Sequence, residues 1–358
     1  MQRPAWGLEM PKGVTLSVDA MGGDHAPGSI LDGLELFCAR RPDVRVLLHG
    51  QEDRLSLLLR DRPNAAAACL VQGAERCVAM DAKPSQALRQ GKGTSLWNAM
   101  VSVEEGQAHA TISAGNTGAL MAFALLRLRA LAGVDRPALV ANWPTPRGFT
   151  SVLDAGANLE CDAAQLVTYA VLGEAFHRAR HGVARPSVGL LNIGAEELKG
   201  HEEIREAARL LREAHLDMDF QGFVEGNDIS LGAVDVVVTD GFTGNVALKT
   251  AEGTAKLLAR VLREEFTRDT LAKLGALAAK PALDRFKARV DPRQSNGAVL
   301  LGVNGLVVKS HGGTDGEGFA AALEVARRMA EGNFLAEVAA NLEHLRQAAP
   351  GRAEQAQS

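Results

Sequence analysis

The chain of 358 residues is long enough to bury a large core, either as one extended α/β domain or as two tightly joined lobes. Its apolar fraction of 46% and charged fraction of 23% are near the globular average and exclude disorder for most of the chain. A formal net charge of -4 argues against a general nucleic-acid-binding protein, and an aromatic content of 4% leaves few side chains for base stacking.

Residues 1–12 are predicted to be a loose leader, because they lack the apolar segment of a secretory signal. Four cysteines without CxxC spacing indicate a reducing compartment. No apolar run reaches the length of a membrane-spanning helix, since the nearest one, residues 119–134, contains Arg127 and Arg129. We therefore expect a cytoplasmic protein that is at most peripherally associated with a membrane.

Apolar runs alternate with helical patterns along residues 13–347, which predicts a single α/β domain with a mostly parallel sheet. The predicted strands are residues 14–18, 44–49, 69–72, 110–112, 138–142, 149–153, 187–191, 220–224, 234–239, 296–301 and 306–308. The helices that bear on the site are predicted at residues 117–131, 162–180, 201–214, 246–266 and 315–346.

Five of these strands end in turns rich in glycine, asparagine or aspartate, at residues 19–25, 113–118, 154–158, 192–194 and 240–245. Glycine permits a sharp turn and leaves main-chain N–H groups bare, and a following helix adds the positive end of its dipole. In a parallel sheet all five turns lie along one edge, so we expect a crevice there that binds an oxyanion. The alternative is a set of ordinary turns in which glycine only provides tightness.

Lys199 is the strongest candidate cation, because a lysine opposes the dipole at a helix start and so needs another reason to be there. Asn245 can donate its side-chain amide at such a helix start, and His25 and His311 can exchange protons. The alternatives are that Lys199 is merely exposed, that Asn245 is an ordinary helix-start residue, and that His25 and His311 are structural. The predicted phosphate-binding residues are Gly22, Gly23, Asp24, His25, Gly115, Asn116, Thr117, Asn158, Gly194, Asp240, Gly241, Thr243, Gly244 and His311.

Signatures of several other chemistries are absent from the sequence. No GxSxG, GxGxxG or GxxxxGK[ST] motif occurs, and residues 201–205 fail the HExxH zinc pattern because position 205 is Arg205. We therefore predict neither a cofactor nor a metal. A site of amides and cations suits stabilisation of a developing oxyanion without a nucleophile of the protein's own.

Residues 269–290 form an amphipathic segment without a strand, and Pro281 predicts its division into two short helices. We expect a projecting helical hairpin at about residues 267–291, which packs against a second subunit or contacts a lipid surface. Residues 348–358 are predicted to be a disordered tail.

Four motifs together resemble one family: DAMGGDHAP at residues 19–27, SAGNTGA at 113–119, TDGFTGN at 239–245 and KSHG at 309–312. They are similar to the bacterial PlsX phosphate acyltransferases, which are fatty acyl-ACP:phosphate transacylases, and the resemblance covers roughly residues 14–333. It implies transfer of a long-chain acyl group from acyl carrier protein to inorganic phosphate. The acyl phosphate would supply a glycerol-3-phosphate acyltransferase in phospholipid synthesis.

The resemblance also implies a Rossmann-like three-layer α/β/α fold, similar to phosphotransacetylases and to isocitrate and isopropylmalate dehydrogenases. It further implies a homodimer, weak membrane contact and a catalytic pair made of Lys199 and Asn245. In that hypothesis Lys199 screens phosphate, and Asn245 with loop amides holds the oxyanion while phosphate attacks the thioester. The rival functions are a phosphate acetyl- or butyryltransferase that uses coenzyme A, a metal-dependent decarboxylating dehydrogenase, and a membrane-docked scaffold.

Overall fold

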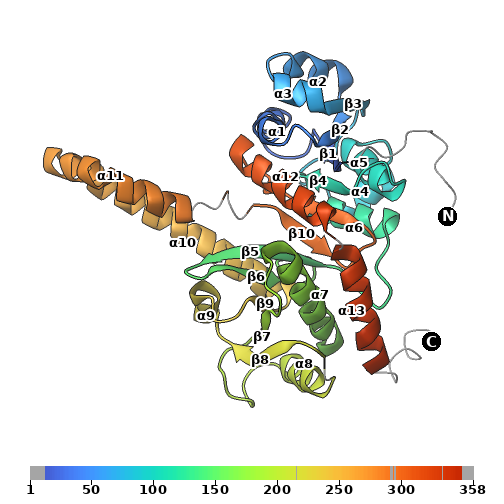
Figure 1. Cartoon of the computed structure of the whole chain (residues 1–358), viewed down its shortest axis with the longest axis vertical. Helices are drawn as coiled ribbons and strands as arrows, with labels where there is room; N and C mark the ends of the chain where they lie inside the picture. The colour runs from blue at the N-terminus through green and yellow to red at the C-terminus, as the bar shows by residue number, and fades with distance from the viewer. Residues whose placement is uncertain (1–12, 215, 291–292, 294–295, 333, 349–358) are drawn as a thin grey trace.

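The computed structural model describes residues 13–214, 216–290, 293, 296–332 and 334–348. The predicted leader and the predicted tail beyond Ala348 lie outside these residues. The strands are β1 (Thr15–Asp19), β2 (Arg45–Gly50), β3 (Cys69–Gly73), β4 (Ala110–Ser113), β5 (Ala138–Thr145), β6 (Gly148–Leu153), β7 (Ser187–Leu191), β8 (Asp219–Val224), β9 (Val236–Val238), β10 (Ala298–Leu301) and β11 (Leu306–Lys309). They form one sheet in the order β3-β2-β1-β4-β11-β10-β5-β6-β9-β7-β8 (Figure 1).

Thirteen helices are assigned within the described residues. They are α1 (Gly28–Arg40), α2 (Glu52–Leu59), α3 (Pro63–Ala68), α4 (Pro84–Gln90), α5 (Ser95–Glu104), α6 (Thr117–Arg127), α7 (Ala163–His181), α8 (Glu202–Glu213), α9 (Gly226–Leu231), α10 (Gly241–Thr267), α11 (Thr270–Val290), α12 (Gly316–Glu331) and α13 (Phe334–Ala348). Apolar side chains of α1, α7, α8, α12 and α13 share one buried cluster with the sheet. Those of α5, α6, α9 and α10 pack in two further clusters against it. The predicted three-layer arrangement is therefore confirmed.

The direction of the strands reverses across the sheet. β1, β2, β3, β4 and β11 run parallel to one another, whereas β10 is antiparallel to both β11 and β5. β5 in turn is antiparallel to β6, which is parallel to β9, β7 and β8. The expectation that all five glycine turns lie on one edge of a parallel sheet is therefore wrong, because the β5–β6 hairpin inverts the second half.

The register nevertheless brings the strand ends of both halves to one level. Val299 of β10 pairs with Val140 of β5 and with Val308, next to the end of β11. On the other side of β5, Ala141 pairs with Val152, next to the end of β6. β1 and β4 end level with β11, while β9 and β7 end level with β6. The turns of both halves therefore start beside the middle of β5.

Two helical predictions need correction. α10 and α11 form a long helical pair that extends away from the sheet (Figure 1), and Pro281 lies inside the single helix α11. Alanine and leucine around Pro281 are strong helix formers, which explains why the helix continues through it. The single helix predicted at 315–346 is instead α12 and α13, because Gly332 adopts an extended conformation after α12. None of the helices in the described ranges has the length and apolar content of a membrane crossing.

Candidate functional site

We call the turns after β1, β4 and β11 the first turn group (residues 19–25, 113–118 and 310–313). Their backbones lie close together. A Cβ on Gly22 would lie 2.8 Å from the amide nitrogen of Gly115, and the N–H of Asp24 donates to the carbonyl of Gly312 at 2.9 Å. Only glycine allows this approach at position 22. The first turn group thus brings together Gly22, Gly23, Asp24, Gly115 and His311 of the predicted site.

Asp19, at the end of β1, is fully buried beneath this group. Its carboxylate accepts hydrogen bonds from the Ser113 hydroxyl at 2.7 Å and from the Met21 N–H at 3.2 Å. Burial raises the pKa of the Asp19 carboxyl, which the hydrogen bonds partly oppose. The Ser113 hydroxyl also accepts the N–H of Gly115 at 2.9 Å. Several N–H groups that the sequence suggested were bare are therefore already bound.

Asn116 is the N-cap of α6 and has a structural role. Its side-chain oxygen accepts the N–H of Ala119 at 2.9 Å, and its amide nitrogen donates to the carbonyls of Met80 and Ala82 at 2.7 and 2.9 Å. Thr117 begins the same helix, and its N–H has no acceptor among the described residues. The side chain of Asn116 is therefore committed to the protein, whereas the start of α6 keeps a free donor.

Lys309 is a site residue that sequence reasoning missed. It ends β11, only 9% of it is exposed, and its ammonium donates to the carbonyls of Ala114 and Ser310. Burial lowers the pKa of Lys309 to about 8, against the opposing effect of Asp19 and Asp24. The available signal was a lysine closing the otherwise apolar run LVVK.

The second turn group follows β6, β7 and β9 (residues 154–158, 192–200 and 240–245). Its centre is the buried carboxylate of Asp154, which accepts the N–H groups of Leu139, Gly156, Ala157 and Asn158 at 2.7–3.1 Å. The side-chain amide of Asn158 donates to the same carboxylate at 2.9 Å. Burial raises the pKa of Asp154 and the N–H donors oppose this shift. Asn158 is thus a buried support rather than an open phosphate ligand.

The start of α10 packs against the Asp154 turn. A Cβ on Gly244 would lie 2.0 Å from the carbonyl oxygen of Asp154, and one on Gly241 would lie 2.4 Å from that of Asn158. The helix begins at Gly241 and not at residue 246 as predicted, because Asp240 caps it by accepting the Thr243 N–H at 2.8 Å. The N–H groups of Gly241 and Gly244 also have acceptors. The expectation of bare donors in this turn is therefore wrong for three residues.

Asn245 lies on the exposed side of this first helical turn. A Cβ on Gly156, whose φ is +130°, would lie 3.4 Å from the Cβ and 3.7 Å from the amide nitrogen of Asn245. The turn at Gly156 therefore packs directly against the Asn245 side chain.

Lys199 is exposed and its ammonium pairs with Glu196 at 2.8 Å. This hydrogen bond raises the pKa of Lys199, so the side chain is a cation at neutral pH. Its loop is fixed by Asn192, whose side-chain amide donates to the carbonyl of Lys199 at 3.0 Å, and by Gly194, where a Cβ would lie 2.5 Å from the Lys199 side chain. Lys199 follows β7 and Asn245 follows the neighbouring strand β9, but no hydrogen bond joins the two side chains within the described residues.

One face of α10 is electrostatically linked to the first turn group. The charge of Lys249 lowers the pKa of both Lys309 and His311, after the larger effect of burial on each. Glu252 and Lys256 of α10 also act on His311. Asn245 is one helical turn before Lys249 and shares its face of the helix. Asn245 thus shares a face of α10 with the lysine whose charge acts on the first turn group.

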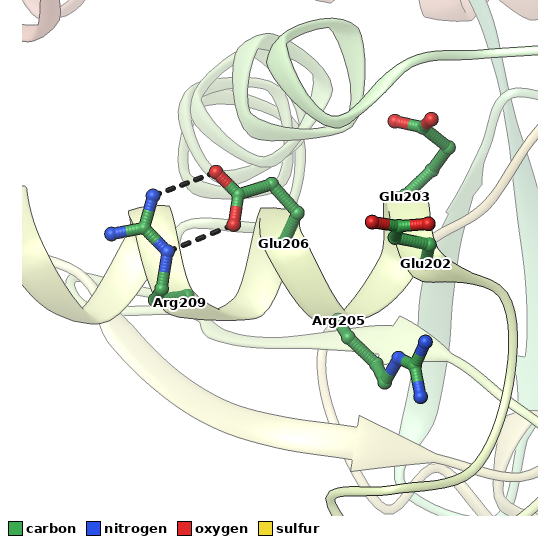
Figure 2. A pocket seen from close by; sticks show the side chains of 5 residues that line it. All are labelled: Glu202, Glu203, Arg205, Glu206 and Arg209. Atoms are coloured by element: carbon green, nitrogen blue, oxygen red, sulfur yellow. Dashed lines mark hydrogen bonds and ion pairs between the residues drawn. The ribbon is translucent and has the colours of Figure 1, made fainter.

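A surface hollow lies on α8, just after the second turn group. Figure 2 shows Glu202, Glu203, Arg205, Glu206 and Arg209 around it, all from the single helix α8. Arg209 is bonded to Glu206 at 2.6 Å, and Arg205 donates to a main-chain carbonyl. Three glutamates beside two engaged arginines do not form a phosphate site. The described residues also contain no cluster of three or more potential metal ligands.

A model of the family described as fatty acid synthesis protein matches residues 14–337. Relatives named phosphate acyltransferase include one from Maricaulis maris, 56% identical over 92% of this chain and 95% of the relative. Another, from Caulobacter vibrioides, is 54% identical over 94% of this chain and 93% of the relative. The chain belongs to this family, the PlsX phosphate acyltransferases. It is an acyltransferase, and the resemblance found in the glycine-rich motifs is confirmed.

Solved structures of similar fold include a phosphotransacetylase from Streptococcus pyogenes, with a TM-score of 0.61 and 15% identity over 90% of this chain and 95% of that chain. The EutD phosphotransacetylase from Staphylococcus aureus has a TM-score of 0.57 and 16% identity over 89% and 94%. Identities this low show the fold alone. The predicted similarity to the phosphotransacetylase fold is confirmed.

Proposed function

We propose that this acyltransferase moves a long-chain fatty acyl group from acyl carrier protein to inorganic phosphate, and that the acyl phosphate enters phospholipid synthesis. Family membership supports acyl transfer to phosphate, and the four motifs that resemble acyl-ACP:phosphate transacylases support the donor. The observation that carries the proposal is the meeting of glycine-rich strand ends from both halves of the sheet beside the middle of β5. The turns of both halves of the sheet can thereby contribute main-chain amides and cationic side chains to one site.

The proposed reaction is a direct displacement. An oxygen of HPO₄²⁻ forms a bond to the thioester carbonyl carbon, the C–S bond breaks, and the proton of the phosphate passes to the departing thiolate. The products are an acyl phosphate dianion and the free thiol, so charge and atoms balance. Because phosphate is already nucleophilic at neutral pH, the protein needs only to hold it in line and to stabilise negative charge.

Asn245 and Lys199 keep the roles proposed from the sequence. Asn245 is a side-chain donor for the oxyanion, and its exposed position at the start of α10, against the turn at Gly156, supports this role. Lys199 is a cation of the neighbouring strand end that screens the phosphate, with Glu196 as its partner in the absence of substrate. Since both turn groups contribute, we propose that residues 13–347 act as one catalytic unit.

The helical pair α10–α11 supports a homodimer. Beyond the first turns of α10, its large exposed apolar side chains are Leu257, Leu258, Val261, Leu262, Leu271, Leu274, Leu277 and Phe286. An exposed apolar surface of this extent is typical of a protein–protein contact, and we propose that a second copy of the chain covers it. Molar mass in solution tests the dimer, and sedimentation with anionic vesicles tests the weak membrane contact.

The experiment that tests the function uses the purified chain, palmitoyl-ACP and inorganic phosphate, without added metal or nucleotide. We expect mass spectrometry to detect palmitoyl phosphate and free carrier thiol in equal amounts, and neither without phosphate. Acetyl-CoA and butyryl-CoA in place of palmitoyl-ACP test the short-chain rival. Turnover with these short donors but not with palmitoyl-ACP would make the protein a short-chain phosphotransacylase.

The same assay tests the catalytic pair. Removing one oxyanion donor typically costs about 3–4 kcal/mol of barrier, so Asn245→Ala should lower kcat by roughly 10²–10³. Lys199→Met should mainly raise the KM for phosphate. Near-normal turnover of both variants would show that neither residue has its proposed role.

A further inference from the structure

The ammonium of Lys309 is a buried cation with spare hydrogen-bonding capacity. Two of its three N–H donors are bound to the carbonyls of Ala114 and Ser310. No carboxylate within the described residues forms an ion pair with it. A buried charge without a paired counter-ion is costly, so its presence calls for a reason other than stability.

The turns beside this ammonium are closely packed, and glycine permits that packing. A Cβ on Gly23 and one on Gly312 would each lie 3.6 Å from the Ala114 carbonyl oxygen that accepts from Lys309. A Cβ on Gly23 would also lie 3.1 Å from the Cβ of Ala114, and one on Gly312 would lie 2.9 Å from the terminal methyl of Met80, so side chains at these positions would crowd the turns around that carbonyl. The neighbouring residues His311 and Gly313 are exposed, so the rim of the first turn group is accessible from solvent.

Lys309 also lies on the face of the sheet that carries the other candidate groups. Side chains alternate along a strand, so Lys309 shares the face of Val307, which packs in the cluster with Phe123 of α6. Ala155 of the second turn group belongs to the same cluster, and Leu248 of α10 packs against it. Lys309, the start of α6 and the first turns of α10 are thus on one side of the sheet.

We propose that the Lys309 ammonium is a phosphate-binding group of the acyltransferase site, acting from the first turn group while Asn245 acts from the second. The inference rests on the proposed function, because it assigns a ligand to one side of that site. The ligand is a tetrahedral phosphate oxyanion, which the remaining N–H of the ammonium binds together with the free N–H at the start of α6. We infer that this oxyanion is inorganic phosphate. The competing ligand is the phosphate group on the arm of the acyl donor.

The first test measures equilibrium binding of inorganic phosphate by calorimetry at neutral pH, without any acyl donor. Lys309→Met keeps the length of the side chain and removes the charge, and Lys273→Met on the distant helix α11 is the matched control. A charged hydrogen bond is worth about 1.5–3 kcal/mol, so we expect phosphate Kd to rise about 10- to 150-fold in Lys309→Met and to be unchanged in the control. A Kd within threefold of wild type in Lys309→Met, with a normal melting temperature, would overturn the inference.

The second test uses pH. The groups whose charges act on Lys309 are Asp19, Asp24 and Lys249, and burial is the largest influence on its pKa of about 8. As pH rises through 8 the ammonium loses its proton, so wild-type phosphate affinity should fall in this range. The fall should be absent in Lys309→Met and shifted upward in Lys309→Arg, because a guanidinium remains charged. The same fall in Lys309→Met as in wild type would contradict the assignment.

Steady-state kinetics distinguish the two phosphate sources. We expect Lys309→Met to raise the KM for inorganic phosphate and to leave the KM for the acyl donor within threefold. A raised donor KM with unchanged phosphate binding would assign Lys309 to the donor's arm and overturn the inference. Failure of the proposed function can be distinguished from failure of this inference, because the calorimetry needs no acyl transfer. Phosphate binding that depends on Lys309, without formation of acyl phosphate, would reject acyl-ACP as the donor but retain the phosphate site.

Discussion

Asn158 donates to Asp154 twice, with its main-chain N–H at 2.7 Å and with its side-chain amide at 2.9 Å, both to the same carboxylate oxygen. The side-chain amide of Asn158 also donates to the carbonyl of Pro137 and to the hydroxyl of Tyr169. The turn after β6 is thus tied to the sheet through the Asp154 carboxylate, which accepts the Leu139 N–H, and to α7 through the Asn158 amide. Because Gly241 and Gly244 of α10 rest on this turn, the position of Asn245 depends on it.

Replacing Asp154 with asparagine should destabilise the fold. The amide group of an asparagine offers one acceptor oxygen where the carboxylate offered two, so at least two buried N–H groups lose their acceptor at about 1–3 kcal/mol each. We expect the free energy of unfolding in urea to fall by roughly 2–6 kcal/mol. Asp162→Asn is the control, because asparagine caps a helix as well as aspartate does at this N-cap of α7. Equal stability of the two variants would mean that the Asp154 network contributes little.

Gly156→Ala should lower kcat through Asn245. At φ +130° an alanine is strained, and because its Cβ would be in van der Waals contact with Asn245 at 3.4 Å, a shift of the turn that relieves the strain moves the side-chain amide. A misplacement of about 1 Å can cost up to about 10²-fold in rate. Gly148→Ala is a matched control, since Gly148 has φ +127° and nothing within 4 Å of the added Cβ. We expect both variants to lose stability and only Gly156→Ala to lose kcat; equal kcat would contradict the contact.

Glu196→Gln should lower the KM for phosphate. The exposed Lys199–Glu196 pair at 2.8 Å competes with phosphate for the ammonium, and breaking it frees the cation. Exposed ion pairs are weak because water screens them, so the decrease should not exceed roughly fivefold. Glu197→Gln is the control, because Glu197 pairs with Arg212 instead. An unchanged or raised KM in Glu196→Gln would separate Lys199 from phosphate binding.

Acid should destabilise the protein through two buried histidines of α7. Burial lowers the pKa of His177 and lowers that of His181 to about 3, while the unfolded chain titrates near about 6.5. Below that pH the unfolded state binds protons that the folded state excludes, so stability is lost as pH falls. For His181 this loss should amount to about 2 kcal/mol between pH 7 and pH 5. Urea unfolding at both pH values should show a smaller loss for His181→Gln than for His344→Gln, an exposed control on α13; identical losses would exclude His181.

Much of the site's location could be predicted from the sequence, because strand, glycine turn and helix succeed one another locally. The direction of β6, β7 and β9 could not, since it follows from the antiparallel pairing of β5 with strands distant in the chain. The sequence did contain a local signal that these N–H groups are hydrogen-bonded within the protein. Asp19, Asp154 and Asp240 each open a turn, and a short carboxylate in that position accepts the N–H groups that follow.

Lys309 could have been recognised from a lysine at the end of a buried strand, but its orientation depends on β11 lying between β4 and β10. Glu196 beside Lys199 was equally visible in the sequence. Spacing alone did not show that these two side chains bond to each other, because the loop conformation depends on Asn192 and Gly200.

β10 and β11 occupy the middle of the sheet, although they are among the last strands of the chain to be synthesised. Until residues 298–309 have left the ribosome, β4 and β5 each present an unsatisfied edge to the surrounding solution. The nascent chain must therefore keep the open edges of two incomplete sheets from pairing with other proteins until these last strands emerge. Catalytic competence then arises late and abruptly, when one short hairpin is inserted between them.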